Sequence, residues 1–139
     1  MIRRATEADV DEVVSIFEPS FALLDFLPRL HTHEENVAFF DRCVREGEAY
    51  LHGHDGVAIL AGDMLTHMYV RPEAIGTGVG HALFEHVKTR RPAGFEFWVF
   101  QQNERARRFY EAHGAVPVEF TDGSGNEERT ADVRYEWRP

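Results

Sequence analysis

Three closely spaced glycines are the clearest sign of chemistry in this 139-residue sequence. Gly76, Gly78 and Gly80 follow an apolar strand pattern over Met64–Val70, and a helical pattern begins at Val79. Glycine lets a ligand approach the backbone closely, and the free N–H groups and dipole of a helix N-terminus favour an anion. The spacing is compatible with a plain glycine-rich turn and with a phosphate cradle, and the physics favours the cradle.

The dinucleotide-binding fingerprint shares part of this spacing. Gly76, Gly78 and Glu96 imitate it, but His81 occupies the position of its third glycine. A loop that contains Pro72 also separates the strand from the glycines, where the fingerprint needs an immediate tight turn. We therefore rank this interpretation below a phosphate cradle of another kind.

The histidines do not show the spacing of a metal site. His31 with His33, and His52 with His54, each place two imidazoles close together, but no third ligand follows at a convincing distance. We expect no metal. His31 and His33 lie beside the apolar segment Phe21–Leu30 and are candidates to touch a substrate.

Two motifs together resemble the GCN5-related N-acetyltransferase (GNAT) family. The family's acetyl-CoA signature is Gln/Arg-x-x-Gly-x-Gly/Ala, after a strand that often ends Leu-Tyr-Val. Here the strand and the signature read Met68-Tyr69-Val70 and Ile75-Gly76-Thr77-Gly78-Val79-Gly80. A later helix resembles the family's second signature through Asn103, Ala106, Phe109, Tyr110 and Gly114. Ile75 replaces the usual Gln or Arg, which removes a side-chain contact and leaves the backbone cradle.

The resemblance spans nearly the whole chain and implies acetyl transfer from acetyl-CoA to an amine. In the family, the strand that corresponds to Met64–Val70 splays from its neighbour, so that free backbone groups near Met68–Val70 bind the pantetheine and polarise the acetyl carbonyl. The residues so assigned to acetyl-CoA are Met68, Tyr69, Val70, Ile75, Gly76, Thr77, Gly78, Val79, Gly80, Asn103, Ala106 and Phe109.

Tyr110 aligns with the tyrosine that commonly protonates the leaving thiolate. A phenol with a pKa near ~10 can supply a thiolate near ~8.5 at modest cost. The alternative role for Tyr110 is packing on the sheet beside Phe109.

The general base is not given by the family pattern, because its usual positions hold Met64, Thr66 and Trp98. His67 is the substitute with a suitable unperturbed pKa, near ~6.5. Strand alternation predicts that it shares a face with Leu65 and Tyr69. The other substitutes are Glu96, Asp63, and a water chain to Glu127 or Glu128.

Charge and composition limit the partners. The formal net charge is −9, and only residues 62–110 are basic, at +2. A basic middle suits a bound anion and acidic flanks suit a cationic second substrate, whereas a nucleic-acid partner would need a basic stripe. The single cysteine, Cys43, cannot form an internal disulfide, and the longest uncharged apolar stretch, Gly56–Gly62, is too short to cross a membrane. We expect a cytoplasmic protein with no membrane and no nucleic-acid partner.

The elements that position these residues read as a single domain over residues 1–139, of the α+β (mixed α/β) class, with a largely antiparallel mixed sheet flanked by helices. Capping and breaking signals predict helices from Thr6 to just before Pro19, from Thr32 to Gly47, from Val79 to before Pro92, and from Asn103 to Gly114. Strands are expected near Tyr50, over Val57–Leu60, Met64–Val70 and Phe95–Phe100, and over Val116–Phe120 and Asp132–Trp137, with Phe95–Phe100 beside Met64–Val70. Phe21–Leu30 is expected to be a loop or broken helix that serves as a substrate wall or as the contact of a homodimer.

Two functions remain open at this point. The first is acetyl transfer from acetyl-CoA to a primary amine of a small cationic molecule or peptide, by direct attack with Tyr110 as general acid. The second is a non-catalytic acyl-CoA-binding or interaction domain on the same fold.

Overall fold

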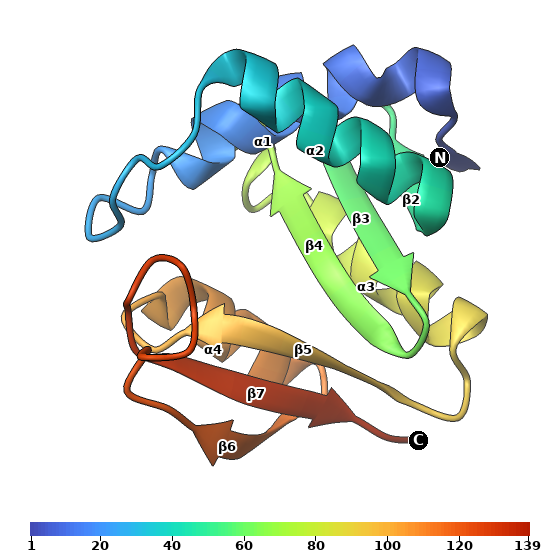
Figure 1. Cartoon of the computed structure of the whole chain (residues 1–139). Coiled ribbons are helices and arrows are strands. Elements are labelled where there is room, and N and C mark those ends of the chain that lie inside the picture. The colour runs from blue at the N-terminus through green and yellow to red at the C-terminus, as the bar shows by residue number, and fades with distance from the viewer.

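A seven-stranded sheet organises the chain, and the computed structural model describes all residues from 1 to 139. The strands are β1 (Ile2–Arg4), β2 (Glu48–His52), β3 (Gly56–Ala61), β4 (Met64–Val70), β5 (Phe95–Phe100), β6 (Val116–Phe120) and β7 (Asp132–Trp137). The helices are α1 (Val10–Phe21), α2 (His33–Glu46), α3 (Val79–Arg90) and α4 (Glu104–Ala112), with short 3-10 turns η1 (Glu7–Asp9) and η2 (Pro72–Ala74). The spatial order is β1-β2-β3-β4-β5-β7-β6, and only the β4–β5 pair is parallel. The predicted fold class is confirmed (Figure 1).

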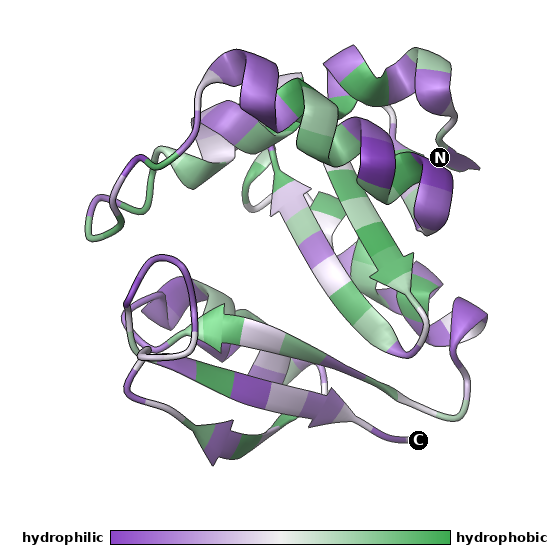
Figure 2. Cartoon of the chain, in the orientation of Figure 1, coloured by the Kyte–Doolittle hydropathy of each residue, from purple (hydrophilic) through white to green (hydrophobic).

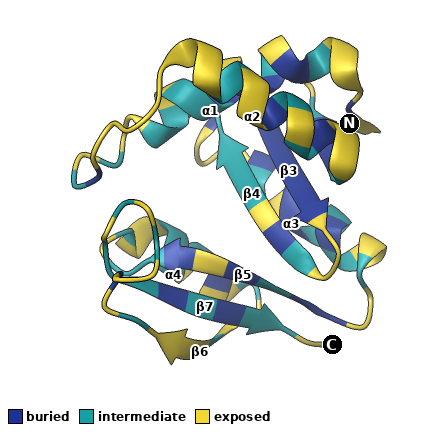
Figure 3. Cartoon of the chain, viewed as in Figure 1, coloured by how far each residue is buried: buried dark blue, intermediate teal, exposed yellow.

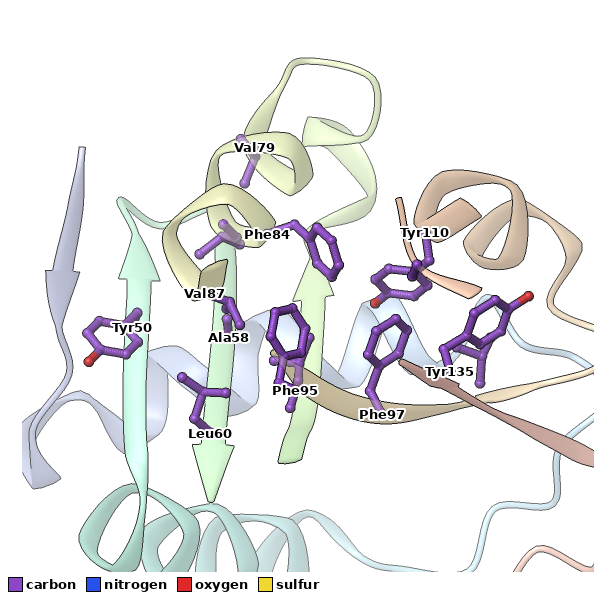
Figure 4. Packing of buried hydrophobic residues seen from close by; sticks show 14 of the residues in the cluster. Tyr50, Ala58, Leu60, Val79, Phe84, Val87, Phe95, Phe97, Tyr110 and Tyr135 are labelled. Carbon is purple, nitrogen blue, oxygen red and sulfur yellow. The ribbon is translucent and has the colours of Figure 1, made fainter. Parts of the chain in front are cut away.

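Helices cover both faces of the sheet, so it has two cores. Val57 and Ile59 of β3 pack under α1 and α2, and the alternate residues Ala58 and Leu60 pack under α3 on the other face. Burial on both faces explains why β3 is an almost continuous apolar run (Figures 2 and 3). The α3 core extends across β5 and β7 to α4 through a group of aromatic rings (Figure 4).

The prediction that the first helix ends before Pro19 is wrong, because α1 continues to Phe21 with Pro19 inside it. Proline has no N–H to donate to the carbonyl four residues earlier, which belongs to Ser15. Arg71, at the end of β4, supplies the missing donor: its Nη1 lies 3.3 Å from the Ser15 oxygen. A tertiary contact therefore satisfies the carbonyl that the proline leaves open.

The N-terminus differs from the prediction in two further details. Ile2–Arg4 forms an antiparallel edge strand beside β2. This strand was not predicted, because a three-residue segment with two arginines shows no strand pattern. The capping signal at Thr6 does operate, since the Thr6 N–H donates to Asp9 Oδ2 at 2.8 Å, but it starts the η1 turn and α1 proper begins at Val10.

A β-bulge in β4 changes which side chains share a face. His67 pairs with Ile59 and Leu65 pairs with Leu60, so Thr66 is an extra residue without a partner. His67 and Tyr69 share a face, as predicted, and this is the face that α1 and α2 cover. Leu65 lies on the α3 face, because the extra residue interrupts simple alternation, and the predicted grouping of Leu65 with His67 is wrong.

Candidate active site

The sheet opens between β4 and β5. Met64 and Glu96 are the one registered pair of these parallel strands, and the strands diverge beyond it (Figure 1). The Arg71 N–H bonds back to Asp55 on the β3 side at 2.7 Å. Alternation then directs the N–H and C=O groups of Met68 and Val70 to the β5 side, where no strand receives them. The opening predicted for β4 is present, and it leaves backbone donors and acceptors free.

A cavity of about 750 Å³ occupies this opening. Its volume lies within the ~300–1,000 Å³ that is typical of ligand sites. The wall is formed by the end of α1 with the following loop, by β4, by the glycine segment, by β5 and by α4. Of the predicted site residues, those that line it are His67, Met68, Tyr69, Val70, Ile75, Gly76, Gly78, Gly80, Asn103, Ala106, Phe109 and Tyr110.

The glycine segment has the backbone that a phosphate cradle requires. Gly76 and Gly78 have φ of 84° and 94°, and Gly78 is the N-cap of α3. A Cβ added at either glycine would meet no atom within 4 Å, so the space beside them is open for a ligand. Thr77 and Val79 do not line the cavity: the Thr77 hydroxyl bonds to the Ala74 carbonyl, and Val79 is buried in the core. For these two residues only the backbone is available to a ligand.

Helix α4 packs against the glycine segment. Asn103 caps it, accepting a hydrogen bond from the Ala106 N–H at 3.3 Å, and Phe109 lies so close to Gly80 that an added Cβ would sit 3.4 Å from the ring. The exposed side chains of Arg105 and Arg108 also line the cavity and form no ion pair within the chain. These two cations were missed from the sequence, because no motif there indicated that they line the cavity.

Tyr110 points from α4 into the aromatic core beside the cavity. Its ring lies 4.4 Å from Phe97 and 5.4 Å from Phe84 between centroids, and burial raises the pKa of its phenol. The Tyr110 hydroxyl has no hydrogen-bond partner in the chain. It is nevertheless not fully enclosed, because the one inaccessible polar side-chain atom without a partner is His86 Nε2. The Tyr110 hydroxyl therefore opens onto the cavity, and Figure 4 shows it pointing the opposite way from the hydroxyl of Tyr135.

His67 reaches the cavity from the other face of the sheet. The rings of Phe39 and Phe40 on α2 lie 5.4 and 5.2 Å from its imidazole, and burial lowers its pKa to about 4. The Thr66 hydroxyl donates to the Ile59 carbonyl, so it accepts from His67 Nδ1 at 3.0 Å. This leaves Nε2 as the nitrogen with a free lone pair.

The other predicted base candidates do not reach the cavity. Glu96 pairs with Arg134 at 3.3 Å, and Asp63, Glu127 and Glu128 are absent from the wall. His67 is thus the one substitute base that the fold brings to the opening.

The loop after α1 forms the apolar wall on the His67 side. Leu23, Leu24 and Phe26 line the cavity, and the Phe26 ring lies 6.2 Å from Phe100 of β5. His31 and His33, predicted as candidates to touch a substrate, do not line it. His31 bonds to Glu127 at 2.9 Å and ties this loop to the loop between β6 and β7, while His33 bonds to Glu18 of α1.

Comparison with known proteins places this geometry in a family. Residues 30–114 match the family model described as an acetyltransferase (GNAT) domain. The peptidyl-lysine N-acetyltransferase YiaC of Escherichia coli is 40% identical over 58 residues, which cover 42% of this chain and 39% of that protein. The match to this curated relative therefore spans well under half of its length.

Solved structures resemble the chain over almost its full length. YjaB from E. coli superposes with a TM-score of 0.73 at 22% identity, covering 99% of this chain and 96% of that one. The ribosomal-protein-S18-alanine N-acetyltransferase from E. coli gives 0.74 at 18% identity, covering 99% and 92%. At these identities the likeness concerns the fold. None of the helices here is both long and apolar enough to cross a membrane.

Proposed function

The chain belongs to the GNAT acetyltransferase family, and on that premise we propose that it transfers an acetyl group from acetyl-CoA to a primary amine of a small cationic molecule or peptide. The observation that carries the proposal is the convergence of three features on one cavity. They are the open glycine cradle, the unpaired edge of β4 and the free hydroxyl of Tyr110.

The residues present fit acetyl-CoA, which would supply an acetyl group activated as a thioester. The first N–H groups of α3 and the positive-φ glycines suit its pyrophosphate, and Arg105 and Arg108 add positive charge on the same wall. The free backbone of Met68 and Val70 suits an amide-containing chain, which adds to β4 as a strand would. Ile75 is 39% exposed on this wall and offers only an apolar contact.

Tyr110 holds the proton that the departing thiolate needs. Burial keeps the pKa of its phenol above 10, so Oη stays protonated throughout the physiological range. The conjugate thiol has a pKa near ~8.5, so proton transfer from the phenol to the thiolate is uphill. The transfer therefore requires close approach of the two groups in a site without water. The lack of any other partner for Oη leaves its proton available for this step.

His67 cannot remove a proton from an ammonium ion. Its pKa of about 4 lies roughly six units below that of an alkyl ammonium, which corresponds to about 8 kcal/mol. The amine therefore arrives neutral, after losing its proton to water. His67 Nε2 then accepts the proton that the nitrogen releases as the amide forms.

The acceptor enters on the α1–α2 face. Asp25 is the carboxylate on that wall, and the acidic flanks of the chain attract cations. The name of the relative YiaC, a peptidyl-lysine N-acetyltransferase, supports a lysine side chain as one acceptor to test.

The second candidate is a non-catalytic acyl-CoA-binding domain, which the low basicity of His67 and the substitution at Ile75 favour. Two measurements separate the candidates. A 100-fold excess of acetyl-CoA over its Kd should stabilise the chain by about 2.7 kcal/mol and raise Tm by roughly 8 °C. Release of CoA thiol with polyamines, amino acids, lysine peptides or peptide N-termini then supports the enzyme. Binding without turnover on any amine indicates the binding domain, and an unmoved Tm rejects both.

A further inference from the structure

Two histidines connect the glycine cradle to α4. His81 lies in the first turn of α3 and lines the cavity, and His113 follows the last turn of α4. Their rings are joined by a contact of 2.9 Å between His81 Nδ1 and His113 Nε2. The His113 ring also packs on Phe109 at 4.1 Å, the residue that contacts Gly80. The pair therefore spans the two motifs that form the cradle.

The hydrogen bonds determine which nitrogens carry protons. His113 Nδ1 lies 2.7 Å from the Phe109 carbonyl, and because a carbonyl can only accept, this nitrogen bears a hydrogen. In neutral His113, Nε2 is then an acceptor, so His81 Nδ1 must donate to it. Neutral His81 is left with a lone pair on Nε2, the nitrogen that does not contact His113, and the residue is exposed and lines the cavity.

One added proton reverses this arrangement. Whether His81 or His113 holds the charge, one hydrogen still lies between the two rings and one is now on His81 Nε2. The proton comes from solvent, and no other bond changes. A lone pair repels a phosphate oxygen, whereas an N–H donates to it.

We propose that His81 and His113 form a proton relay in which uptake of one proton turns His81 Nε2 from a hydrogen-bond acceptor into a donor toward a phosphate oxygen in the glycine cradle. His81 is the contacting residue and His113 is the positioning residue that fixes its tautomer. The inference rests on the proposed function, since the phosphate is that of the coenzyme.

The charged groups around the pair come from both helices. Glu85 lies one turn after His81, and its pKa is lowered first by the hydrogen bond from Lys88 and also by His81 and His113. Arg108 of α4 lines the same cavity. Glu85 favours proton uptake by the pair, while Lys88 and Arg108 oppose it.

The test measures the Kd of dephospho-CoA by calorimetry between pH 6 and pH 8.5. This ligand keeps the pyrophosphate and lacks the phosphomonoester, whose own titration near pH ~6 would confuse the result. The wild type should bind about three- to tenfold more weakly at pH 8 than at pH 6, with a slope of log Kd no steeper than one per pH unit. His81→Gln should remove this dependence. The matched control His52→Gln, on β2 and away from the cavity, should retain it.

A nitrogen-15 NMR spectrum of the histidine rings shows which ring nitrogens carry hydrogen, and it needs no ligand. At pH 8 the wild type should show hydrogen on Nδ1 of His81, and His113→Leu should move it to Nε2, the usual position in a free imidazole. A wild-type His81 with hydrogen on Nε2 at pH 8, or an unchanged pH dependence in His81→Gln, overturns the relay alone. Failure of dephospho-CoA to bind at any pH overturns the proposed function and this role with it.

Discussion

Replacing Tyr110 by Phe removes one oxygen and tests the proposed proton donor. The Tyr110 hydroxyl has no partner in the chain, so its loss leaves no buried group unsatisfied, and the free energy of unfolding should change by less than about 0.5 kcal/mol. General acid catalysis typically contributes ~10²- to 10⁴-fold, which corresponds to roughly 3–5 kcal/mol of activation free energy. Tyr110→Phe should therefore release CoA thiol that much more slowly, with an unchanged affinity for acetyl-CoA.

Tyr135→Phe is the matched control, because both rings lie in the same aromatic cluster. The Tyr135 hydroxyl donates to Glu111 at 2.5 Å and accepts from Arg107 Nε at 3.0 Å, so its removal breaks two hydrogen bonds to charged groups. This variant should lose about 1–2 kcal/mol of stability and keep its rate. Thermal unfolding and thiol release under saturating acetyl-CoA measure both quantities. A Tyr110→Phe protein that turns over as fast as its parent would show that water, not this hydroxyl, protonates the thiolate.

Two further predictions concern the cradle and the base. Gly78→Ala should weaken acetyl-CoA binding at least tenfold in a calorimetric titration. The control is Gly53→Ala, because Gly53 also has positive φ and open space but lies in a turn outside the cavity wall. This control should show a similar backbone strain of about 1 kcal/mol and a normal affinity. Because burial lowers the His67 pKa from 6.5 to about 4, its contribution to stability is complete above pH 6.5 and declines as the pH falls from 6.5 to 4. His67→Asn should flatten that part of the pH–stability curve, and an equally steep curve in the variant would assign the slope to another group.

Local signals account for most of what the sequence predicted correctly. The turn before α3 is specified by glycines next to a helix start, and the cap of α4 by Asn103, which accepts a hydrogen bond from the N–H three residues ahead. The opening between β4 and β5 was predicted from the family resemblance alone, because no residue in either strand indicates that pairing stops after Met64. Signals that act over a few residues were sufficient to predict the helices and strands. They were insufficient to predict the shape of the sheet.

The errors share a different cause, which is contact between residues distant in the sequence. Pro19 predicts a helix end, but Arg71, 52 positions later, supplies a donor to the Ser15 carbonyl, and the helix continues. Glu96 reads as a base until Arg134 pairs with it. His67 has an ordinary pKa in the sequence, and two phenylalanines from α2 lower it by enclosing the ring. Charge and basicity are properties of the assembled site, so residue type alone does not give the protonation behaviour of these candidates.

The bulge at Thr66 explains how one strand contributes to both sides of the proposed site. Before it, Leu65 faces the α3 core; after it, His67 faces α1 and α2 while the backbone of Met68 faces the opening. A one-residue change of register exchanges the two faces of a strand, so without the extra residue either Leu65 or His67 would be on the wrong side. Tyr110 approaches the same opening from the α4 face. The proposed proton donor and the proposed proton acceptor therefore lie on opposite faces of the sheet, and the bulge allows β4 to keep its core contact while it presents His67 on the α1–α2 face.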